Sequence, residues 1–300
     1  MNKKISKTII AVLALGALTP GAVAQERFVL KPHAAIGLGK ALDMKSTLPM
    51  VSEKASSNEF GLDFGYTFWQ KGGNSLGVNV GLAYRPTSLK LTAGDMQYQY
   101  DAPADADMDG DTYVRYYRQV VEGLEEKIST GYLQVPLYLD YRYRISDRVA
   151  VYGNLGVEFG FKCSAKINKI IGTVETYGVY PQYDDLVINE SYLNGFGETG
   201  VNDAVKGKVN ARGFMPSLLV GAGFEFRLYG PLWFDLGVRY NCGFNDMFKH
   251  CIDGNAPFTA ETAPVTYTVA EGENVRSLTD YMTKSRLSQV QLDLGFSIRF

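Results

Sequence analysis

The chain has 300 residues, a formal net charge of −2 and 46% hydrophobic residues, including 20 Tyr and 16 Phe. A charge this close to neutral, with no basic stripe interleaved with aromatic residues, excludes nucleic-acid binding. Enrichment in Tyr and Phe favours β structure, and beyond the N-terminal segment no apolar stretch is long enough for a spanning helix.

The N-terminal segment has the organisation of a secretory signal peptide. Lys3, Lys4 and Lys7 precede a short apolar run at residues 8–18, and residues 22–24 form an A-x-A cleavage site. The apolar run is shorter than the ~20 residues that a membrane-spanning helix needs. The expected organisation is therefore a signal peptide at residues 1–24 and one exported domain at residues 25–300.

Eight segments then alternate apolar with small or polar residues, with the period of two that defines a β-strand. Most of them are long enough to cross a bilayer when tilted by about 45°. The first is the weakest, with only Ile36 and Leu38 against Gly37 and Gly39. The predicted strands are residues 33–40, 60–69, 76–85, 133–144, 149–162, 214–228, 232–244 and 290–300.

The connections between these strands alternate sharply in length. Short turns at residues 70–75, 145–148 and 229–231 contrast with long segments near 41–59, 92–126, 163–212 and 245–286. This alternation is typical of periplasmic turns and extracellular loops in a membrane barrel, and it predicts that both termini are periplasmic. Residues 89–100 and 112–120 can form a hairpin at the extracellular rim.

The non-apolar face of the strands carries Gly and charges of both signs. A soluble sandwich or lipocalin-like barrel also alternates, but its polar face is coated mainly with Thr and Lys. Opposite charges inside a barrel can neutralise one another, whereas an isolated buried charge is costly. The predicted interior charge network is Asp63, Arg85, Asp140, Arg142, Glu158, Glu225, Arg227, Asp235, Arg239, Asp293 and Arg299. Together with inward Trp69 and Trp233, it is expected to plug the barrel.

The complete pattern, whose last strand ends on Phe300, resembles the small outer-membrane β-barrel proteins of the OmpA/OmpX type. The motif Y-L-Q-V-P-L at residues 132–137, followed by Y-R-Y at residues 141–143, is similar to the PorT-like branch. The resemblance implies an all-β chain forming a single eight-stranded antiparallel transmembrane barrel with long extracellular loops. It also implies a multi-pass protein of the Gram-negative outer membrane, in contact with its lipids and lipopolysaccharide.

An acidic run in the second long connection has the spacing of a calcium-binding loop. Asp105, Asp107, Asp109 and Asp111 follow the D-x-D-x-D-G pattern, in which alternate carboxylates converge on one cation. Tyr116 occupies the position of the closing bidentate glutamate. The missing carboxylate favours the alternative, a solvated acidic loop tip, and we expect no cofactor apart from this calcium candidate.

Catalytic chemistry has little support in the sequence. Of the two histidines, His33 begins the first predicted strand on the periplasmic side, and His250 lies in a long loop. A loop serine such as Ser277 or Ser285 could pair with His250, but no spacing singles either one out. An incidental loop histidine is the simpler interpretation, and we predict that the protein is not an enzyme.

Three cysteines in an exported chain leave at least one free thiol if a pair forms. Cys163 and Cys251 both fall in long connections and can pair, and Cys242 can alternatively pair with Cys251. His250 and Cys251 alone provide too few ligands for zinc.

The expected function is a structural or surface-interaction barrel whose specific work resides in the extracellular loops. Aromatic residues in the third loop suit recognition of a protein or glycan, although loops that bind nothing fit the same composition: Tyr177, Tyr180, Tyr183, Tyr192 and Phe196. The PorT-like resemblance implies an alternative, an accessory barrel of a protein export machine. A third hypothesis is a lipid A-modifying outer-membrane enzyme.

Overall fold

The computed structural model describes residues 27–101, 115–189, 196–201, 209–252, 258–259, 261–268 and 272–300. The predicted signal peptide and the four aspartates of the calcium candidate lie outside these residues. The described chain consists of antiparallel strands with two short 3-10 turns. None of its helices has the length and hydrophobicity to span a membrane.

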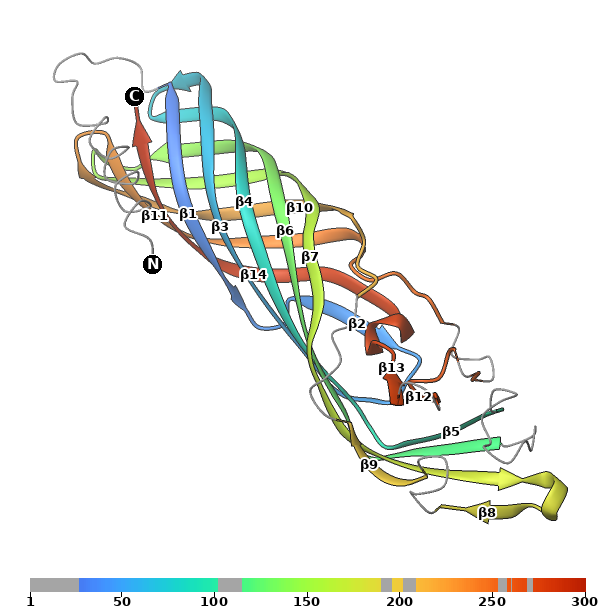
Figure 1. Cartoon of the computed structure of the whole chain (residues 1–300). Helices are drawn as coiled ribbons and strands as arrows, with labels where there is room; N and C mark the ends of the chain where they lie inside the picture. The colour runs from blue at the N-terminus through green and yellow to red at the C-terminus, as the bar shows by residue number, and fades with distance from the viewer. Residues whose placement is uncertain are drawn as a thin grey trace, which may run out of the picture.

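The strands form a closed barrel, which confirms the predicted eight-stranded antiparallel architecture (Figure 1). The ring runs in the order β1-β3-β4-β6-β7-β10-β11-β14 and closes between β14 and β1. Pairing at this seam extends from Val29↔Arg299 to Leu38↔Val290. The ring strands are β1 (Phe28–Leu38), β3 (Met50–Lys71), β4 (Asn74–Ala93), β6 (Arg115–Arg144), β7 (Val149–Tyr180), β10 (Phe214–Tyr229), β11 (Leu232–Asp246) and β14 (Met282–Arg299).

The first strand begins five residues earlier than the alternation predicts, because β1 starts at Phe28. The backbone N–H of Phe28 donates to the carbonyl of Phe300 at 2.9 Å, so the two ends of the described chain close the sheet together. Pro32 and Ala34 on the outward face, and Lys31 on the inward face, weaken the apolar pattern of this segment. His33 consequently lies mid-strand inside the barrel, not at a strand start.

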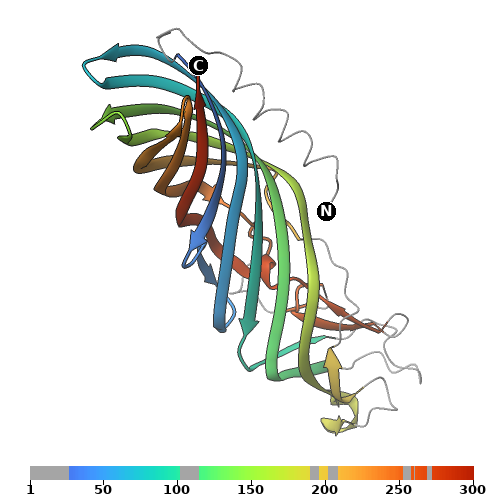
Figure 2. The ribbon, with the colours of Figure 1, turned by 90° about the vertical axis from the view of Figure 1, so that its left-hand side faces the viewer.

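Four neighbouring strands, β3, β4, β6 and β7, continue far beyond their predicted ends and rise out of the barrel (Figures 1 and 2). We call the end with these extensions the loop end, and the end with the short turns and Phe300 the terminal end. The predicted rim hairpin is present as Met96–Asp101 paired with residues 115–120. Shorter elements complete the loop end: β2 (Leu42–Ser46), β5 (Met96–Asp101), β8 (Leu186–Ile188), β9 (Gly197–Val201), β12 (Val265–Thr268), β13 (Gly272–Val275), η1 (Pro181–Tyr183) and η2 (Leu278–Tyr281).

The apolar face of the long strands changes sides along their length. Toward the terminal end of β6, Leu133, Leu137 and Leu139 point outward and are 40–49% exposed. Toward the loop end of the same strand, Leu124 and Ile128 point inward and are at most 1% exposed. Outward apolar side chains suit lipid, and inward apolar side chains suit a core surrounded by water. A continuous strand therefore passes from a lipid-facing to a water-facing environment.

The change occurs along one row of directly paired residues on five neighbouring strands. Phe60 pairs with Tyr84, Tyr84 with Leu133, Leu133 with Phe161, and Phe161 with Phe214. We call the outward apolar surface from this row to the terminal end the apolar belt. Its exposed side chains include Phe60, Leu62, Phe64, Leu82, Leu137, Leu139, Leu155, Phe224 and Phe296.

The inward apolar side chains of the loop end pack into one cluster, which we call the cap core. It packs the extended strands against β2, residues around 247–252 and η2, at the loop end of the barrel. The aromatic chain from Tyr98 to Phe258 to Tyr281, with ring centroids 5.4 and 6.3 Å apart, crosses this cluster. Its members include Leu42, Leu89, Leu91, Tyr98, Leu124, Ile128, Ile170, Val174, Phe196, Phe248, Leu278 and Tyr281.

A charge placed in the apolar belt should be costly, whereas the same charge above it should be tolerated. We expect Leu137→Arg to destabilise the folded barrel by about 2–4 kcal/mol, because Leu137 lies in the middle of the belt. Ser129→Arg, on the same face of β6 but above the belt, is the matched control and should change stability by less than about 0.5 kcal/mol. Urea unfolding in lipid vesicles measures both variants, and equal losses would contradict the boundary.

Candidate functional site

The barrel interior is organised around one buried carboxylate, that of Glu59, which is 0% exposed. Arg85 Nη2 donates to Glu59 Oε2, and Arg239 Nη1 donates to Glu59 Oε1 at 2.7 Å. His33 Nε2 lies 3.4 Å from the same Oε1 atom. Because these four residues come from β3, β4, β11 and β1, the cluster ties opposite sides of the barrel together.

Both arginines continue the network to further carboxylates. Arg85 Nη1 lies 2.6 Å from Glu158 Oε1, and Arg239 Nη2 lies 3.2 Å from Asp293 Oδ2. Arginine's planar fork allows each guanidinium to bridge two acids, which offsets the cost of burying all three charges. The polar centre of the barrel is thus cross-linked from β3 to β14.

A second cluster lies nearer the terminal end and is centred on Glu225. Arg142 Nε donates to Glu225 Oε2, and Arg299 Nη2 donates to Glu225 Oε1 at 2.6 Å. The Arg142 guanidinium also lies 4.4 Å from the ring centroid of Trp233, which is fully buried. Lys31 completes the cluster, with its Nζ atom 3.4 Å from an Asp235 oxygen. Paired charges and an indole therefore fill this end of the interior.

Acidic groups outnumber arginine and lysine in the described interior. Hydroxyl groups donate hydrogen bonds to some of these acids. Tyr138 donates to Asp63 at 2.7 Å, and Ser297 donates to Asp235 at 3.1 Å. The seven interior acids are Glu59, Asp63, Asp140, Glu158, Glu225, Asp235 and Asp293, and the five bases are Lys31, Arg85, Arg142, Arg239 and Arg299.

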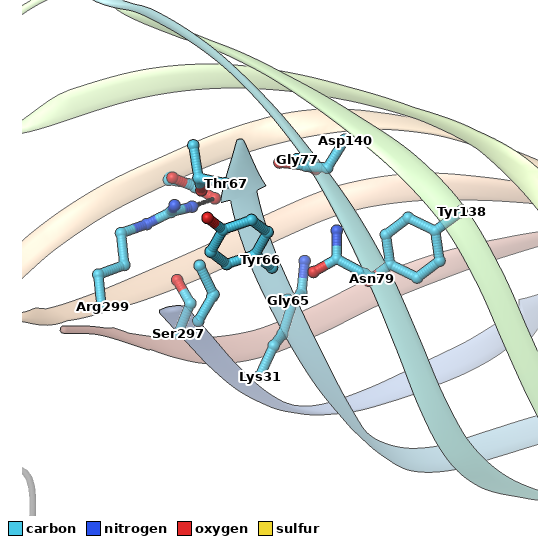
Figure 3. Close-up of a pocket in the computed structure, with 12 residues that line it drawn as sticks. Lys31, Gly65, Tyr66, Thr67, Gly77, Asn79, Tyr138, Asp140, Ser297 and Arg299 are labelled. Atoms are coloured by element: carbon cyan, nitrogen blue, oxygen red, sulfur yellow. Dashed lines mark hydrogen bonds and ion pairs between the residues drawn. The ribbon is translucent and has the colours of Figure 1, made fainter. Parts of the chain in front are cut away.

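A small cavity lies beside the Glu225 cluster, lined by Lys31, Asn79, Tyr138, Asp140 and Arg299 among others (Figure 3). Its volume is about 20 Å³, which is room for little more than one water molecule. The lining combines cations, acids and amides, so it suits ordered water better than an apolar ligand. The cavity can solvate Asp140, which the surrounding side chains leave half-buried.

Ten of the eleven residues predicted for the interior network are buried or half-buried inside the barrel, and Arg227 lies at its terminal mouth, with its guanidinium 5.7 Å from the ring centroid of the buried Trp233. Arg227 is exposed at the terminal end, where its Nε donates to the Gly230 carbonyl at 2.8 Å. It lies at the last turn of β10, beyond the filled interior. Trp69 is also misplaced by the prediction: it is 44% exposed, because an irregular register between Thr67 and Trp69 turns its side chain outward.

Three residues that form interior ion pairs escaped the prediction: Lys31, His33 and Glu59. Glu59 fell in a segment predicted as a loop, although it continues the inward phase of Gly61 and Asp63 by one step. Extending that alternation past Phe60 would have found it. Lys31 lay before the first predicted strand, and no local signal distinguishes it from a residue in a linker.

Outside the barrel interior, the side chains that the sequence suggested for catalysis or metal binding do not form a site. Within the described residues no group of His, Cys, Asp or Glu has the geometry to hold a metal ion. Cys163, Cys242 and Cys251 are all free thiols. His250 Nδ1 lies 3.1 Å from the Met282 carbonyl, and the Ser285 hydroxyl accepts the backbone N–H of Phe248 at 3.0 Å. These contacts are structural and give no serine–histidine pair.

The third loop's aromatic residues are not all at the surface, as a recognition role would require. Tyr180 and Phe196 are buried in the cap core. The Tyr177 hydroxyl accepts a hydrogen bond from Gln97 Nε2 at 2.8 Å, and Tyr192 lies outside the described residues. Tyr183 remains 55% exposed. On the extended β7, the alternation of faces buries Tyr180 and leaves Tyr177 half-buried.

The cap contains buried carboxylates of its own, Glu126 on β6 and Asp280 on η2. The Oε2 atom of Glu126 accepts the backbone N–H of Leu278 at 2.6 Å, which fastens η2 to the extended sheet. Burial among apolar side chains raises the pKa of Glu126 to about 7, and the Leu278 hydrogen bond only partly opposes this shift. Burial likewise raises the pKa of Asp280 in the same turn.

Comparison with known proteins shows which family this barrel belongs to. The model of the outer membrane protein beta-barrel domain matches residues 24–249. The chain belongs to this family. It is therefore an outer-membrane β-barrel protein, in agreement with the predicted location. No curated protein sequence matches the chain.

Solved barrels resemble the chain only distantly. Ail of Yersinia pestis, crystallised with the heparin analogue sucrose octasulfate, is 12% identical with a TM-score of 0.28, over 91% of this chain and 97% of Ail. The translocator domain of the autotransporter NalP from Neisseria meningitidis is 10% identical with a TM-score of 0.23, over 99% and 95% of the two chains. Neither likeness bears on ligand or function.

Removing the central carboxylate should be costly because two buried arginines would lose their shared partner. We expect Glu59→Gln to destabilise the barrel by about 3–5 kcal/mol in urea unfolding in vesicles. Arg227→Gln is the control, since this exposed side chain does not contact Glu59; it gives up only an exposed cation–π contact with Trp233 and should cost less than about 1 kcal/mol. Similar losses in the two variants would show that Glu59 has no special role.

Docking of η2 should weaken as pH rises, since the folded state binds a proton at Glu126 more tightly than the open state does. The effect should develop between the ordinary pKa of 4.5 and the folded pKa of about 7, and level off above it. The hydrogen-exchange protection factor of the Leu278 amide should fall by on the order of a hundredfold at most between pH 5 and 8. Glu126→Gln, which keeps an acceptor for Leu278, should largely abolish this dependence; an unchanged profile would refute the assignment.

Proposed function

We propose that this protein is a non-enzymatic surface barrel, with its chain ends in the periplasm and its loop end outside the cell. In this role the capped loop end presents a recognition surface to a protein or glycan partner. The short turns at the terminal end and the large folded loop end support this orientation, since outer-membrane barrels have short periplasmic turns and longer extracellular loops.

The observation that carries this proposal is the cap core. Four extended strands, β2 and η2 fold around it, so the long connections form one packed unit instead of separate loops. A preorganised surface loses little conformational entropy on binding, which favours affinity. A purely structural barrel has no need for such a large extramembrane unit.

The exposed tip of the cap is the strongest candidate for contact with a partner. Tyr183, Leu186 and Val187 are 55%, 49% and 58% exposed, and we call them the tip patch. Between them, Asp184 and Asp185 both have left-handed backbones, with φ of 59° and 57°. Consecutive non-glycine residues in this conformation are uncommon and are found where surrounding structure holds them, often at functional sites. Exposed tyrosine and aliphatic side chains beside carboxylates suit a protein partner.

A closed lumen belongs to the same proposal. The two interior charge clusters and a cavity of about 20 Å³ support it, because neither leaves a continuous path for a solute. An eight-stranded ring encloses only enough space for its own side chains. Large single-channel conductance in planar bilayers would contradict it.

Two alternatives make different predictions. An accessory barrel of a protein export machine would co-purify with periplasmic or secretory components. A lipid A-modifying enzyme would change the mass spectrum of lipid A when the protein is removed. Within the described residues, the hydrogen bonds of His250 and Ser285 are structural and support neither alternative. The exposed tip patch supports a recognition role.

Replacing the tip patch should abolish partner binding without disturbing the barrel. We expect the triple variant Tyr183→Ser, Leu186→Ser, Val187→Ser to lose proteins or glycans cross-linked to the wild type on intact cells. Heat-modifiable migration on gels should be retained, since these side chains lie outside the cap core. Tyr229→Ser, at an 85% exposed site in a short turn, is the control. Unchanged cross-linking in the triple variant would refute the proposed surface.

A further inference from the structure

The mouth of the barrel at the terminal end gathers three arginines around one tryptophan. The Cζ atoms of Arg142, Arg144 and Arg227 lie 4.4, 6.0 and 5.7 Å from the ring centroid of Trp233. These residues lie at the terminal ends of β6, β10 and β11, which form a run of adjacent strands together with β7 (Figure 1). Trp233 is buried, Arg144 is half-buried and Arg227 is exposed, so the cluster reaches from the interior to the opening.

Stacking on the indole offsets only part of the electrostatic cost of this cluster. A cation over the face of a tryptophan is attracted to the ring, but cations that share one ring repel one another. Glu225 neutralises Arg142, whose Nε donates to its Oε2 atom, while the Oε1 atom accepts from Arg299 Nη2 at 2.6 Å. Arg227 Nε donates to a neutral group, the Gly230 carbonyl, at 2.8 Å. The mouth therefore concentrates positive charge beyond its central acid.

The charges inside the barrel are distributed unevenly along its axis. The cluster around Glu59 contains four acids, two arginines and one histidine: Glu59, Asp63, Glu158, Asp293, Arg85, Arg239 and His33. Around Glu225 and Trp233, the described residues provide five bases and three acids: Lys31, Arg142, Arg144, Arg227, Arg299, Asp140, Glu225 and Asp235. The terminal end of the lumen is thus its positive end, and Arg227 connects it to solvent.

Two buried donors of the mouth have no acceptor within the described residues. They are Trp233 Nε1 and Arg142 Nη2, and their residues are 0% and 3% exposed. A buried N–H group without an acceptor is costly, so most such groups in folded proteins have a partner. Because the Arg142 guanidinium lies against the indole of Trp233, one small group with several acceptor oxygens can serve both donors. This observation is independent of the charge imbalance and points to the same kind of ligand.

A tetrahedral oxyanion fits these donors better than a carboxylate does. Its oxygens accept hydrogen bonds from several directions, whereas the two oxygens of a carboxylate lie in one plane. The donors of the mouth come from three strands, and the guanidinium fork matches phosphate geometry. A phosphate monoester carries a charge of roughly −1.5 to −2 near pH 7, which is close to the excess of positive charge at this end.

We propose that the mouth of the barrel at the terminal end binds a soluble phosphate group through Arg142, Arg144, Arg227 and Trp233. Arg144 and Arg227 continue the inward phase of Arg142 and Glu225, on the opposite face of the strands from the apolar belt. The source is therefore phosphate in solution and not a phospholipid headgroup. The inference does not rest on the proposed function, because the site lies at the terminal end whichever side of the membrane that end faces.

Trp233 supplies the reporter for a direct test, because the chain contains only two tryptophans. Trp69→Phe removes the other one, which is 44% exposed on the outer surface. This barrel is folded in maltoside micelles without phospholipid, and inorganic phosphate is titrated at constant ionic strength set with chloride. We expect a saturable change in Trp233 fluorescence. Equilibrium dialysis of radiolabelled phosphate against the wild type should give one bound phosphate per barrel.

A matched pair of variants locates the site. Arg227→Gln removes an exposed arginine beside Trp233, and Arg148→Gln removes an exposed arginine from the neighbouring short turn. A hydrogen bond to a charged group typically contributes tenfold or more, so Arg227→Gln should raise the Kd for phosphate at least about tenfold. Arg148→Gln should change the Kd by less than about twofold. Heat-modifiable migration on gels confirms that both variants are folded.

Three results would overturn the inference. A fluorescence change that does not saturate, and that chloride reproduces, would show charge screening alone. Equal weakening by Arg227→Gln and Arg148→Gln would show that the overall charge of the terminal end, not the mouth, attracts phosphate. Loss of phosphate binding on transfer from micelles to nanodiscs of phosphatidylethanolamine and phosphatidylcholine would assign the site to a lipid headgroup. None of these results bears on the tip patch, so the proposed function stands or fails separately.

Discussion

The structure depends on one constraint: the outer face of each long strand meets lipid along one part of its length and water along the other. Below the row of Phe60, Tyr84, Leu133 and Phe161, lipid surrounds the barrel, so apolar side chains face outward and charges face inward. Above this row water surrounds the sheet, and the apolar side chains face the cap core. Side chains of a strand point to only two faces. The same strand therefore meets both conditions by carrying its apolar residues on the outer face below the row and on the inner face above it.

The interior follows from this exchange. With apolar residues committed to lipid, the lumen must be filled by polar groups, and buried charges are tolerated only when paired. Glu59 sits at the upper part of this polar interior, close to where the cap core begins, and joins β1, β3, β4 and β11 through His33, Arg85 and Arg239. The proposed closed lumen, together with the packed cap core, directs attention away from transport and toward the outer surface of the loop end.

That outer surface has two regions with different chemistry. The tip patch is aromatic and aliphatic, whereas the flank of the extended sheet between the tip and the belt carries a row of paired lysines, Lys54, Lys90, Lys127 and Lys169.

The sequence by itself determined the eight strands, the antiparallel ring and the side of each strand that faces lipid, because alternation within a membrane-crossing strand is a local property. It also indicated most of the interior charges, since Asp63 and Arg239 stand in phase with neighbouring glycines. It could not show the extensions of β3, β4, β6 and β7, where the alternation continues in opposite phase and reads as a loop. Only the tertiary structure decided that Glu59 is the centre of the network, that Arg227 is exposed at its edge and that Trp69 points outward. It also decided that four lysines distant in sequence form one row: Lys54, Lys90, Lys127 and Lys169. Each of these depends on register between strands, and register is set by closure of the whole sheet.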